Sequence, residues 1–153
     1  MENDKKIELY KKLEKIDIDI REYELVVFKE ASSLQLEYLE DWWITNSKDK
    51  EVPKQYKEFI SRVNGFDFDA LSFYSLDIED ENNLYESNLI YWESDSLKEY
   101  ISLGEDSISW YCYSNKDNKF YILDKPSGSL IEKCTTFNNM ACRAFESIMP
   151  MKK

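Results

Sequence analysis

The stretch VPKQYKEFISRVNG, residues 52–65, carries the clearest structural signal in the sequence. Pro53 suits the first position of a helix, where a missing N–H costs nothing. Gly65, which follows Asn64, can adopt the left-handed conformation that ends a helix. The stretch therefore predicts an amphipathic helix over 53–63 that packs on a core. The side chains that line its apolar face at helical spacing are Tyr56, Phe59, Ile60 and Val63.

The residues before this stretch are predicted to be largely helical. Residues 5–16 place apolar side chains among lysines and glutamates in a helical pattern. Residues 18–29 fit a helix or a strand, because the LVVF run within them favours β-structure but is short. Ser32 or Ser33 can cap a further helix. The apolar positions of that helix are Leu36, Leu39 and Trp43.

After Gly65 the apolar period shortens toward two, which is typical of strands. Strands are predicted at 66–76, 88–92, 99–103, 107–113 and 119–124, and SLIEKC at 129–134 can form another. Turns are predicted at 77–83, 104–106, 114–118 and 124–128. A last helix is predicted at 137–149. Helices, then consecutive strands, then one helix indicate a single α+β domain over 1–153 with a largely antiparallel sheet.

The composition is acidic. Of 153 residues, 20 are Lys or Arg and 31 are Asp or Glu, so the net charge is −11. This charge disfavours a nucleic-acid backbone or an anionic membrane surface as partner, since both require basic protein surface. It is compatible with a basic protein partner such as a nuclease. For an arbitrary protein, solubility alone is the more common reason for such acidity.

The sequence predicts a cytoplasmic protein with reduced thiols. Its first residues are charged and lack the apolar segment of a signal peptide. No apolar run approaches the about 20 residues needed to span a bilayer. The three cysteines are widely spaced and odd in number, which argues against a disulfide framework.

Most catalytic chemistry is excluded or disfavoured by the residues present. The chain has no histidine, so no Ser–His or Cys–His pair can form. Neither a phosphate-binding loop nor a dinucleotide fingerprint is present. The acidic run at 77–83 lacks the glycine of an EF-hand loop, since Asn82 stands in its place. We therefore expect no metal and no cofactor. Carboxylate pairs leave a small acidic hydrolase as the least favoured function.

The abundance of aromatic residues is more informative than the abundance of carboxylates. The chain has 11 Tyr, 8 Phe and 4 Trp. In the predicted strand 107–113, alternation directs Ile108, Trp110 and Cys112 to one face. It directs Ser109, Tyr111 and Tyr113 to the other face. One face of the sheet can then pack on the core while the other meets a partner, or helices can cover both faces.

The motifs, taken in order, resemble the SUKH superfamily, the Smi–Knr cell-wall-regulator relatives, and its YrhA-like bacterial branch most closely. The resemblance starts at Val52 and runs through the motif-bearing part, 52–149. It rests first on the helix motif Val52, Pro53, Tyr56, Phe59, Asn64 and Gly65. It continues with Asn88 at the start of a strand, then Tyr100, Leu103, Gly104 and Glu105, then Ile108, Trp110, Tyr111 and Tyr113. It ends with Asp124, Pro126 and Gly128 and the helix near Phe137 and Phe145.

The resemblance implies an α+β fold whose helices flank a curved sheet, and it implies no enzymatic activity. Many bacterial members are thought to be immunity proteins that bind and neutralise a toxin, often a nuclease. Fungal members are regulators that act through protein contacts. We therefore expect a non-enzymatic protein-binding domain, either an immunity protein or a regulatory module without a toxin.

Candidate partner-binding residues are the acidic and aromatic side chains on the sheet side of the domain. Loops carry binding residues because a rigid scaffold positions them. The loop after the first strand contributes Asp77, Glu79, Asp80 and Glu81. The end of the next predicted strand contributes Trp92 and Glu93, and the turn beside Gly104 contributes Glu105 and Asp106. Together they are predicted to bind a basic protein.

Overall fold

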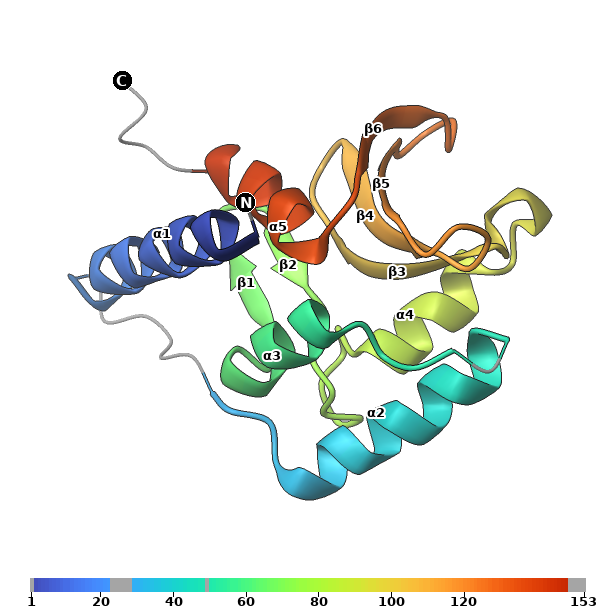
Figure 1. Cartoon of the computed structure of the whole chain (residues 1–153), viewed down its shortest axis with the longest axis horizontal. Helices are drawn as coiled ribbons and strands as arrows, with labels where there is room; N and C mark the ends of the chain where they lie inside the picture. Colours follow the sequence, from blue (N-terminus) through green and yellow to red (C-terminus); the bar gives the residue numbers. More distant parts are fainter. Residues whose placement is uncertain (1, 23–28, 49, 149–153) are drawn as a thin grey trace.

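The computed structural model describes residues 2–22, 29–48 and 50–148 (Figure 1), and in the first of these segments it describes the side chains of 5–15. The helices are α1 (Glu2–Glu22), α2 (Ser33–Asn46), α3 (Lys54–Arg62), α4 (Leu84–Tyr91), the short 3-10 helix η1 (Asp95–Leu97) and α5 (Phe137–Glu146). The strands are β1 (Phe66–Phe68), β2 (Leu71–Phe73), β3 (Tyr100–Glu105), β4 (Ser109–Ser114), β5 (Phe120–Asp124) and β6 (Leu130–Cys134).

The described strands form one six-stranded sheet in the order β1-β2-β3-β4-β5-β6, and every pairing is antiparallel. Each strand therefore pairs with its neighbour along the chain. Figure 1 shows β3 to β6 bending as they cross the domain, with α1 to α3 and α5 at the flanks. The predicted α+β fold with an antiparallel sheet is confirmed.

Helix α3 is the predicted amphipathic helix, and its boundaries differ by one residue from the prediction. Pro53 is the residue before the helix, with φ −58° and ψ 136°, and Lys54 is the first helical residue. Gly65 has φ +98°, the left-handed region expected of it. A Cβ atom on Gly65 would lie 2.7 Å from the Cβ of Ser75, so close packing also requires glycine. The fully buried side chains of the helix are Tyr56, Phe59 and Ile60.

The side-chain amide of Asn64 joins three elements. Its Oδ1 accepts a hydrogen bond from the N–H of Leu76 at 2.7 Å, and its Nδ2 donates to Gln35 Oε1 at 3.1 Å. Gln35 belongs to a capping box at the start of α2, whose cap is Ser32. The asparagine of the helix motif therefore has a structural role.

The stretch predicted as one strand at 66–76 is a tight hairpin. Strands β1 and β2 pair Phe66 with Phe73, and the turn residues Asp69 and Ala70 have φ of 56° and 74°. Two consecutive positive φ angles match the right-handed twist of a two-residue hairpin. Asp and Ala replace the usual Asn-Gly pair here, which is why the turn was not predicted.

The strand predicted at 88–92 is wrong, because these residues belong to helix α4 and the turn after it. Asn83 caps the helix by accepting a hydrogen bond from the N–H of Glu86 at 2.9 Å. The residues then bury one face at helical spacing, at Leu84, Tyr85, Asn88 and Tyr91. The run NLIYW favours strand locally, but the cap and the burial of this face determine a helix.

The turn predicted at 104–106 begins two residues later than expected. Gly104 and Glu105 lie in β3, beside a register shift between Ser102 and Gly104. A Cβ atom on Gly104 would lie 2.5 Å from the carbonyl oxygen of Ser72, so the bulge needs glycine because two strands approach closely. Strand β4 starts at Ser109, after the turn.

Other predicted boundaries agree with the structure to within a few residues. The turn at 124–128 is held by Asp124, whose Oδ2 accepts from Ser127 N at 3.1 Å and from Ser127 Oγ at 2.7 Å. Gly128 has φ +75° in this turn. The last helix ends at Glu146. The LVVF run lies outside the described residues.

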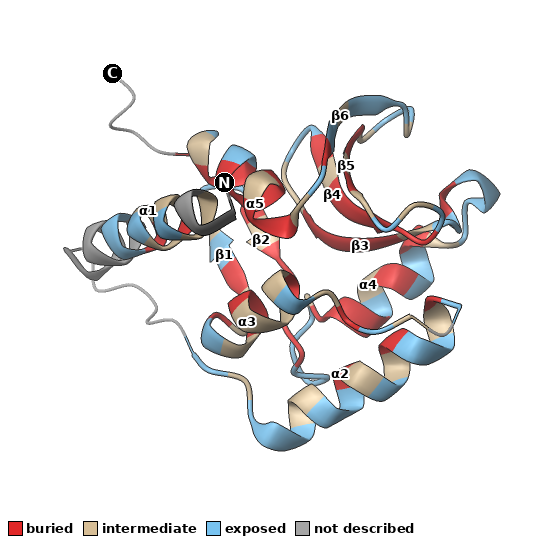
Figure 2. Ribbon diagram, viewed as in Figure 1, coloured by how far each residue is buried: buried red, intermediate tan, exposed pale blue. Residues whose placement is uncertain are grey.

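Figure 2 shows that β3, β4 and β5 are mostly buried, whereas β6 is mostly exposed. The two faces of the sheet carry two buried clusters. Tyr111 and Tyr113 of β4 point into the main core, which also holds Phe59, Phe73, Phe120, Phe137 and Phe145. Cys112 lies in a second cluster with Tyr91, Leu97 and Leu123, and Trp110 packs against it. The predicted alternation along β4 is therefore confirmed, and α4 and η1 cover part of the second face.

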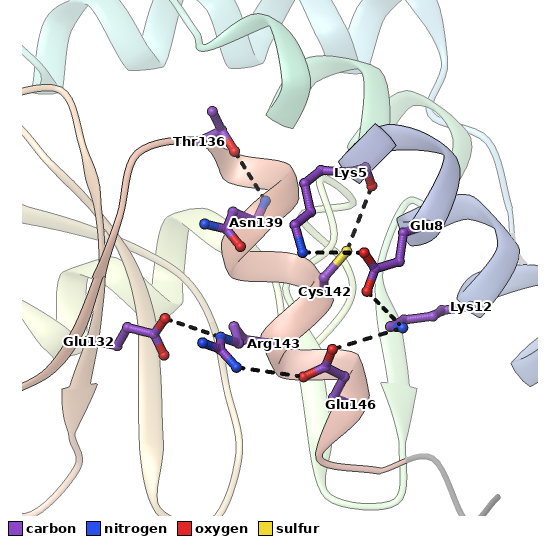
Figure 3. A network of polar contacts seen from close by, with 9 residues as sticks. All are labelled: Lys5, Glu8, Lys12, Glu132, Thr136, Asn139, Cys142, Arg143 and Glu146. Atoms are coloured by element: carbon purple, nitrogen blue, oxygen red, sulfur yellow. Dashed lines mark hydrogen bonds and ion pairs between the residues drawn. The ribbon is translucent and has the colours of Figure 1, made fainter. Parts of the chain in front are cut away.

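Helices α1 and α5 pack together at the side of the sheet. Figure 3 shows the polar contacts across this junction. Lys12 pairs with Glu8 at 3.0 Å and with Glu146 at 3.9 Å, and Cys142 Sγ lies 3.7 Å from the carbonyl oxygen of Lys5. Between these contacts Leu9 is fully buried, so α1 closes one side of the main core.

Candidate functional site

Residues 63–97 contain nine Asp or Glu and no Lys or Arg. This segment includes the loop 77–83 and the whole of α4, so neither of these elements carries a basic residue of its own. The loop begins directly after the β2 end of the sheet, and α4 continues it. The predicted acidic loop is therefore joined to a helix whose involvement the sequence did not indicate.

Two of the loop's carboxylates hold its shape. Asp77 Oδ1 accepts from the N–H of Glu79 at 3.0 Å, and Asp80 Oδ1 accepts from the N–H of Asn82 at 3.0 Å. Asp80 Oδ2 also accepts from Ser75 Oγ at 2.9 Å. Short aspartate side chains commonly bond the backbone two residues further on and so make turns. Asp77 and Asp80 therefore serve the loop itself.

Glu79 and Glu81 differ from these aspartates. Both are exposed, and neither carboxylate makes a hydrogen bond or an ion pair with any residue that the structure describes. They are the loop charges that are free to meet a partner.

Glu81 also lines a groove of about 370 Å³ between the loop, α4 and the β3–β4 end of the sheet. Its aromatic wall is Tyr91 against Trp110, whose ring centroids lie 4.9 Å apart at 81°. Glu105 and Lys125 form an ion pair at 3.3 Å in the same lining. The remaining lining residues are Tyr74, Asn82, Ser87, Ile90 and Leu97. We call this feature the acidic groove.

Asp106 lies beside the acidic groove but has a structural role. Its Oδ1 accepts from the N–H groups of Ile108 and Ser109 at 3.0 and 2.8 Å. Its Oδ2 accepts from the hydroxyl of Tyr111 at 2.6 Å. These three bonds close the β3–β4 turn, so the Asp106 carboxylate stabilises the turn itself.

Trp92 and Glu93 do not join the other predicted residues. They follow the last residue of α4, and neither lines the acidic groove. Trp92 Nε1 donates to the carbonyl oxygen of Tyr100 at 2.7 Å, which fixes the half-buried ring. Glu93 is exposed. The predicted set therefore divides between the acidic groove and the opposite flank of α4.

Sequence reasoning missed Ser87, Ile90 and Lys125 as groove residues. Ile90 falls in the predicted strand at 88–92, and Ser87 lies between that strand and the predicted turn at 77–83. A helical reading of 84–91 would have placed Ser87 one turn before both Ile90 and Tyr91. Ile90 is 68% exposed, which is unusual for a large aliphatic side chain beside a groove. Lys125 comes from the turn after β5. It is far from α4 in the sequence, and only the tertiary structure brings it to the groove.

The ionisable groups behind the acidic groove are held in their neutral forms. Burial raises the pKa of Cys112 to about 12, so its thiol stays protonated at neutral pH. Burial also raises the pKa of Tyr91, whose hydroxyl lies 3.3 Å from Cys112 Sγ, and the neighbouring thiol adds to the shift. Neither group is an activated nucleophile. In the described part of the chain, no cluster of three or more Cys, Asp or Glu side chains is placed to hold a metal ion.

Among the helices of the described segments, none combines the length and apolarity required to span a membrane. Models of known protein families give no match to this chain, and a search of curated proteins gives none either.

Proposed function

We propose that this chain is a non-enzymatic protein-binding domain that captures a basic partner protein at the acidic groove. The observation that carries the proposal is the position of Glu79 and Glu81. Their unpaired carboxylates stand at and beside a groove walled by Tyr91 and Trp110, in a segment without basic residues. Carboxylates steer a basic partner toward the surface, and aromatic side chains supply contact area once it arrives.

The partner in this proposal is a toxin, and the chain is its cytoplasmic immunity protein. The ordered motifs from Val52 to Phe145 support this reading through their resemblance to the SUKH superfamily. Nucleases must bind anionic nucleic acid and therefore carry basic surface. An acidic inhibitor complements that surface and competes with the substrate for it.

Binding kinetics with any toxin domain that a neighbouring gene encodes test the proposal. The variant replaces Glu79 and Glu81 with Gln, which removes two charges without disturbing the turns made by Asp77 and Asp80. The association rate at low salt should fall by about threefold or more, and its salt dependence should flatten. The matched control replaces Glu14 and Glu30 with Gln, two exposed acids in the N-terminal part of the chain. This control should associate at the wild-type rate.

Equal association rates for the two double variants would refute the acidic groove as the capture site. A cell-growth assay tests the toxin directly, since co-expression of the chain should restore growth to cells that produce the toxin domain. If the folded wild-type chain neither binds the toxin nor protects cells, the regulatory-module reading replaces the immunity reading.

A further inference from the structure

Four aromatic rings join α2 to α4 on the flank of α4 that faces away from the acidic groove. Tyr38 contacts Tyr85 edge to face, with ring centroids 4.9 Å apart. Trp42 lies 5.2 Å from Tyr85 and stacks on Trp92 at 6.0 Å, with ring planes 12° apart. Leu89 lies between Tyr85 and Trp92 on the same row of α4, four residues after the first and three before the second. We call these five residues the aromatic face.

The aromatic face is only partly used by the core. Helix α2 buries its other side through Leu39 and Trp43, which are fully buried. On the aromatic face, by contrast, Tyr38 is 53% exposed and Leu89 is 65% exposed. Large apolar side chains gathered on one surface are typical of interaction sites, whereas scattered ones are not informative.

The charges on the two helices of the aromatic face have one sign. Neither α2 nor α4 contains Lys or Arg. The exposed acids Glu37, Asp41, Glu86 and Glu93 belong to these helices or follow α4 directly, and none forms an ion pair with a described residue. An apolar centre with a charged rim is the usual anatomy of a protein interface. This rim repels nucleic acid, anionic membranes and a second copy of the same face.

We propose that the aromatic face docks a basic amphipathic helix of the partner protein. This inference rests on the proposed function, because it names the element of the partner that binds. The row from Tyr85 to Trp92 is about 10 Å long at 1.5 Å per residue, which matches two turns of a partner helix. Such a helix presents apolar anchors at i, i+4 and i+7 and lysines or arginines at its edges. The ring contacts join α2 to α4. The aromatic face is therefore a continuous apolar surface rather than two separate patches.

The two surfaces meet along α4. Leu89 lies on the aromatic face, and Ile90, its neighbour, lines the acidic groove. Their exposed fractions of 65% and 68% make α4 a ridge that one partner covers from both flanks. Trp92 and Glu93 would then contact the same partner as the groove residues, at the other edge of a single interface.

A peptide titration tests the docking site without knowledge of the partner. The probe is an 18-residue peptide of leucine and lysine arranged as an amphipathic helix, and its control is a scrambled peptide of the same composition. Fluorescence anisotropy of the labelled peptides is measured against the full chain. We expect the amphipathic peptide to bind about tenfold more tightly than the scrambled one, because only the first can bury an apolar strip.

Matched variants assign that binding to the aromatic face. Leu89→Ser and Tyr38→Ser should each weaken the amphipathic peptide about threefold to tenfold. Ile7→Ser on α1, where the side chain is 54% exposed, should leave binding unchanged. Melting temperatures near wild type would show that the exposed substitutions leave the fold intact.

Equal affinity for both peptides, or wild-type affinity in Leu89→Ser and Tyr38→Ser, would overturn the docking site. So would self-association of the chain that Leu89→Ser abolishes, because a second copy would then be the occupant. If the toxin binds wild type and Leu89→Ser with equal affinity, the docking site is rejected and the proposed function is retained. Peptide binding that needs Leu89, together with no binding of the neighbouring toxin, would support the docking site and reject the toxin as the partner.

Discussion

The side-chain amide of Asn88 pairs with both main-chain groups of Ser102. Its Nδ2 donates to the Ser102 carbonyl oxygen at 2.9 Å, and its Oδ1 accepts from the Ser102 N–H at 2.8 Å. Strand β2 pairs with β3 only at Gly104 and Glu105, so Ser102 has no strand neighbour on that side. The helical amide thus replaces a missing strand at a buried position.

Replacing Asn88 with Ala should lower the free energy of unfolding by about 2–4 kcal/mol. The variant leaves the N–H and the carbonyl of Ser102 buried without partners, and each such group costs about 1–3 kcal/mol. Urea denaturation measures the loss. Asn139→Ala on α5 is the control, since that side chain makes no hydrogen bond with a described residue. A loss equal to that of the control would mean that the amide pairing contributes nothing.

Gly65→Ala should destabilise the domain more than Gly128→Ala, although both glycines have positive φ. A Cβ on Gly65 lies 2.7 Å from the Cβ of Ser75, whereas a Cβ on Gly128 lies 3.3 Å from Leu97 Cδ2, the end of a flexible side chain. The left-handed conformation costs each variant about 1 kcal/mol, and the clash adds to the cost only at Gly65. Thermal melts of the two variants compare them directly. A greater loss of stability in Gly128→Ala would show that the close contact between position 65 and Ser75 does not determine the cost of the substitution.

Asp106→Ala should lower stability by about 2 kcal/mol, because it leaves two turn N–H groups and the Tyr111 hydroxyl without their acceptor. Glu79→Ala should change stability by less than about 0.5 kcal/mol, since its carboxylate has no partner in the described structure. Chemical denaturation of both variants checks the division between structural and free carboxylates. Similar losses in both would contradict that division.

Asp117→Asn should reduce stability at neutral pH, by about 1 kcal/mol or less, with the deficit shrinking in acid. Burial alone raises the pKa of Asp117, but hydrogen bonds from Tyr121 and Lys133 outweigh it and lower the pKa to about 2. A carboxylate whose pKa is lowered on folding stabilises the native state above its unfolded pKa near 3.8 and stops doing so as pH falls through about 2.

The measurement for Asp117 is the difference in unfolding free energy between wild type and variant from pH 7 to pH 2. The difference should be constant down to about pH 4 and decline below it. Tyr121→Phe removes one donor and should show a smaller effect of the same sign. A difference that grows in acid would reverse the assigned direction of the shift.

The parts of the fold that the sequence predicts well are those specified locally. In α3, Tyr56, Phe59 and Ile60 recur at helical spacing, and Gly65 ends the segment, so the signal lies within 14 residues. The alternation of Trp110 and Tyr111 likewise predicts two faces of one strand. Neither prediction requires knowledge of distant residues.

The predictions that fail depend on tertiary contacts. NLIYW favours strand by composition, but Asn88 lies in a helix because its amide is needed beside Ser102. Gly104 reads as a turn residue, yet it stays in β3 because Ser72 approaches it closely. Tertiary contacts override local propensity at both places.

The sequence pointed to acidic residues of the candidate site by their charge. It did not distinguish the acids that hold turns from those that have no partner in the described structure. Of the predicted residues, Glu81 and Glu105 line one groove. Sequence alone did not separate Asp80 from Glu81, although aspartate bonds nearby backbone more readily because its side chain is short. The grouping of Ile90 with Trp110 could not be predicted, because it depends on α4 being a helix that crosses the sheet.

The packing of α1 on α5 sets an order of events for a chain that folds during synthesis. Each hairpin of the sheet joins strands that are neighbours in sequence, so it can close as soon as its second strand has been made. Helix α1 is made first, yet its packing partner begins only at Phe137. Helix α1 also contacts α3, through the Lys6–Glu58 ion pair and through Arg62 over the Tyr10 ring. Its contacts with α5 can nevertheless form only after every strand of the sheet has been made, so the full burial of Leu9 and Leu13 comes late in synthesis.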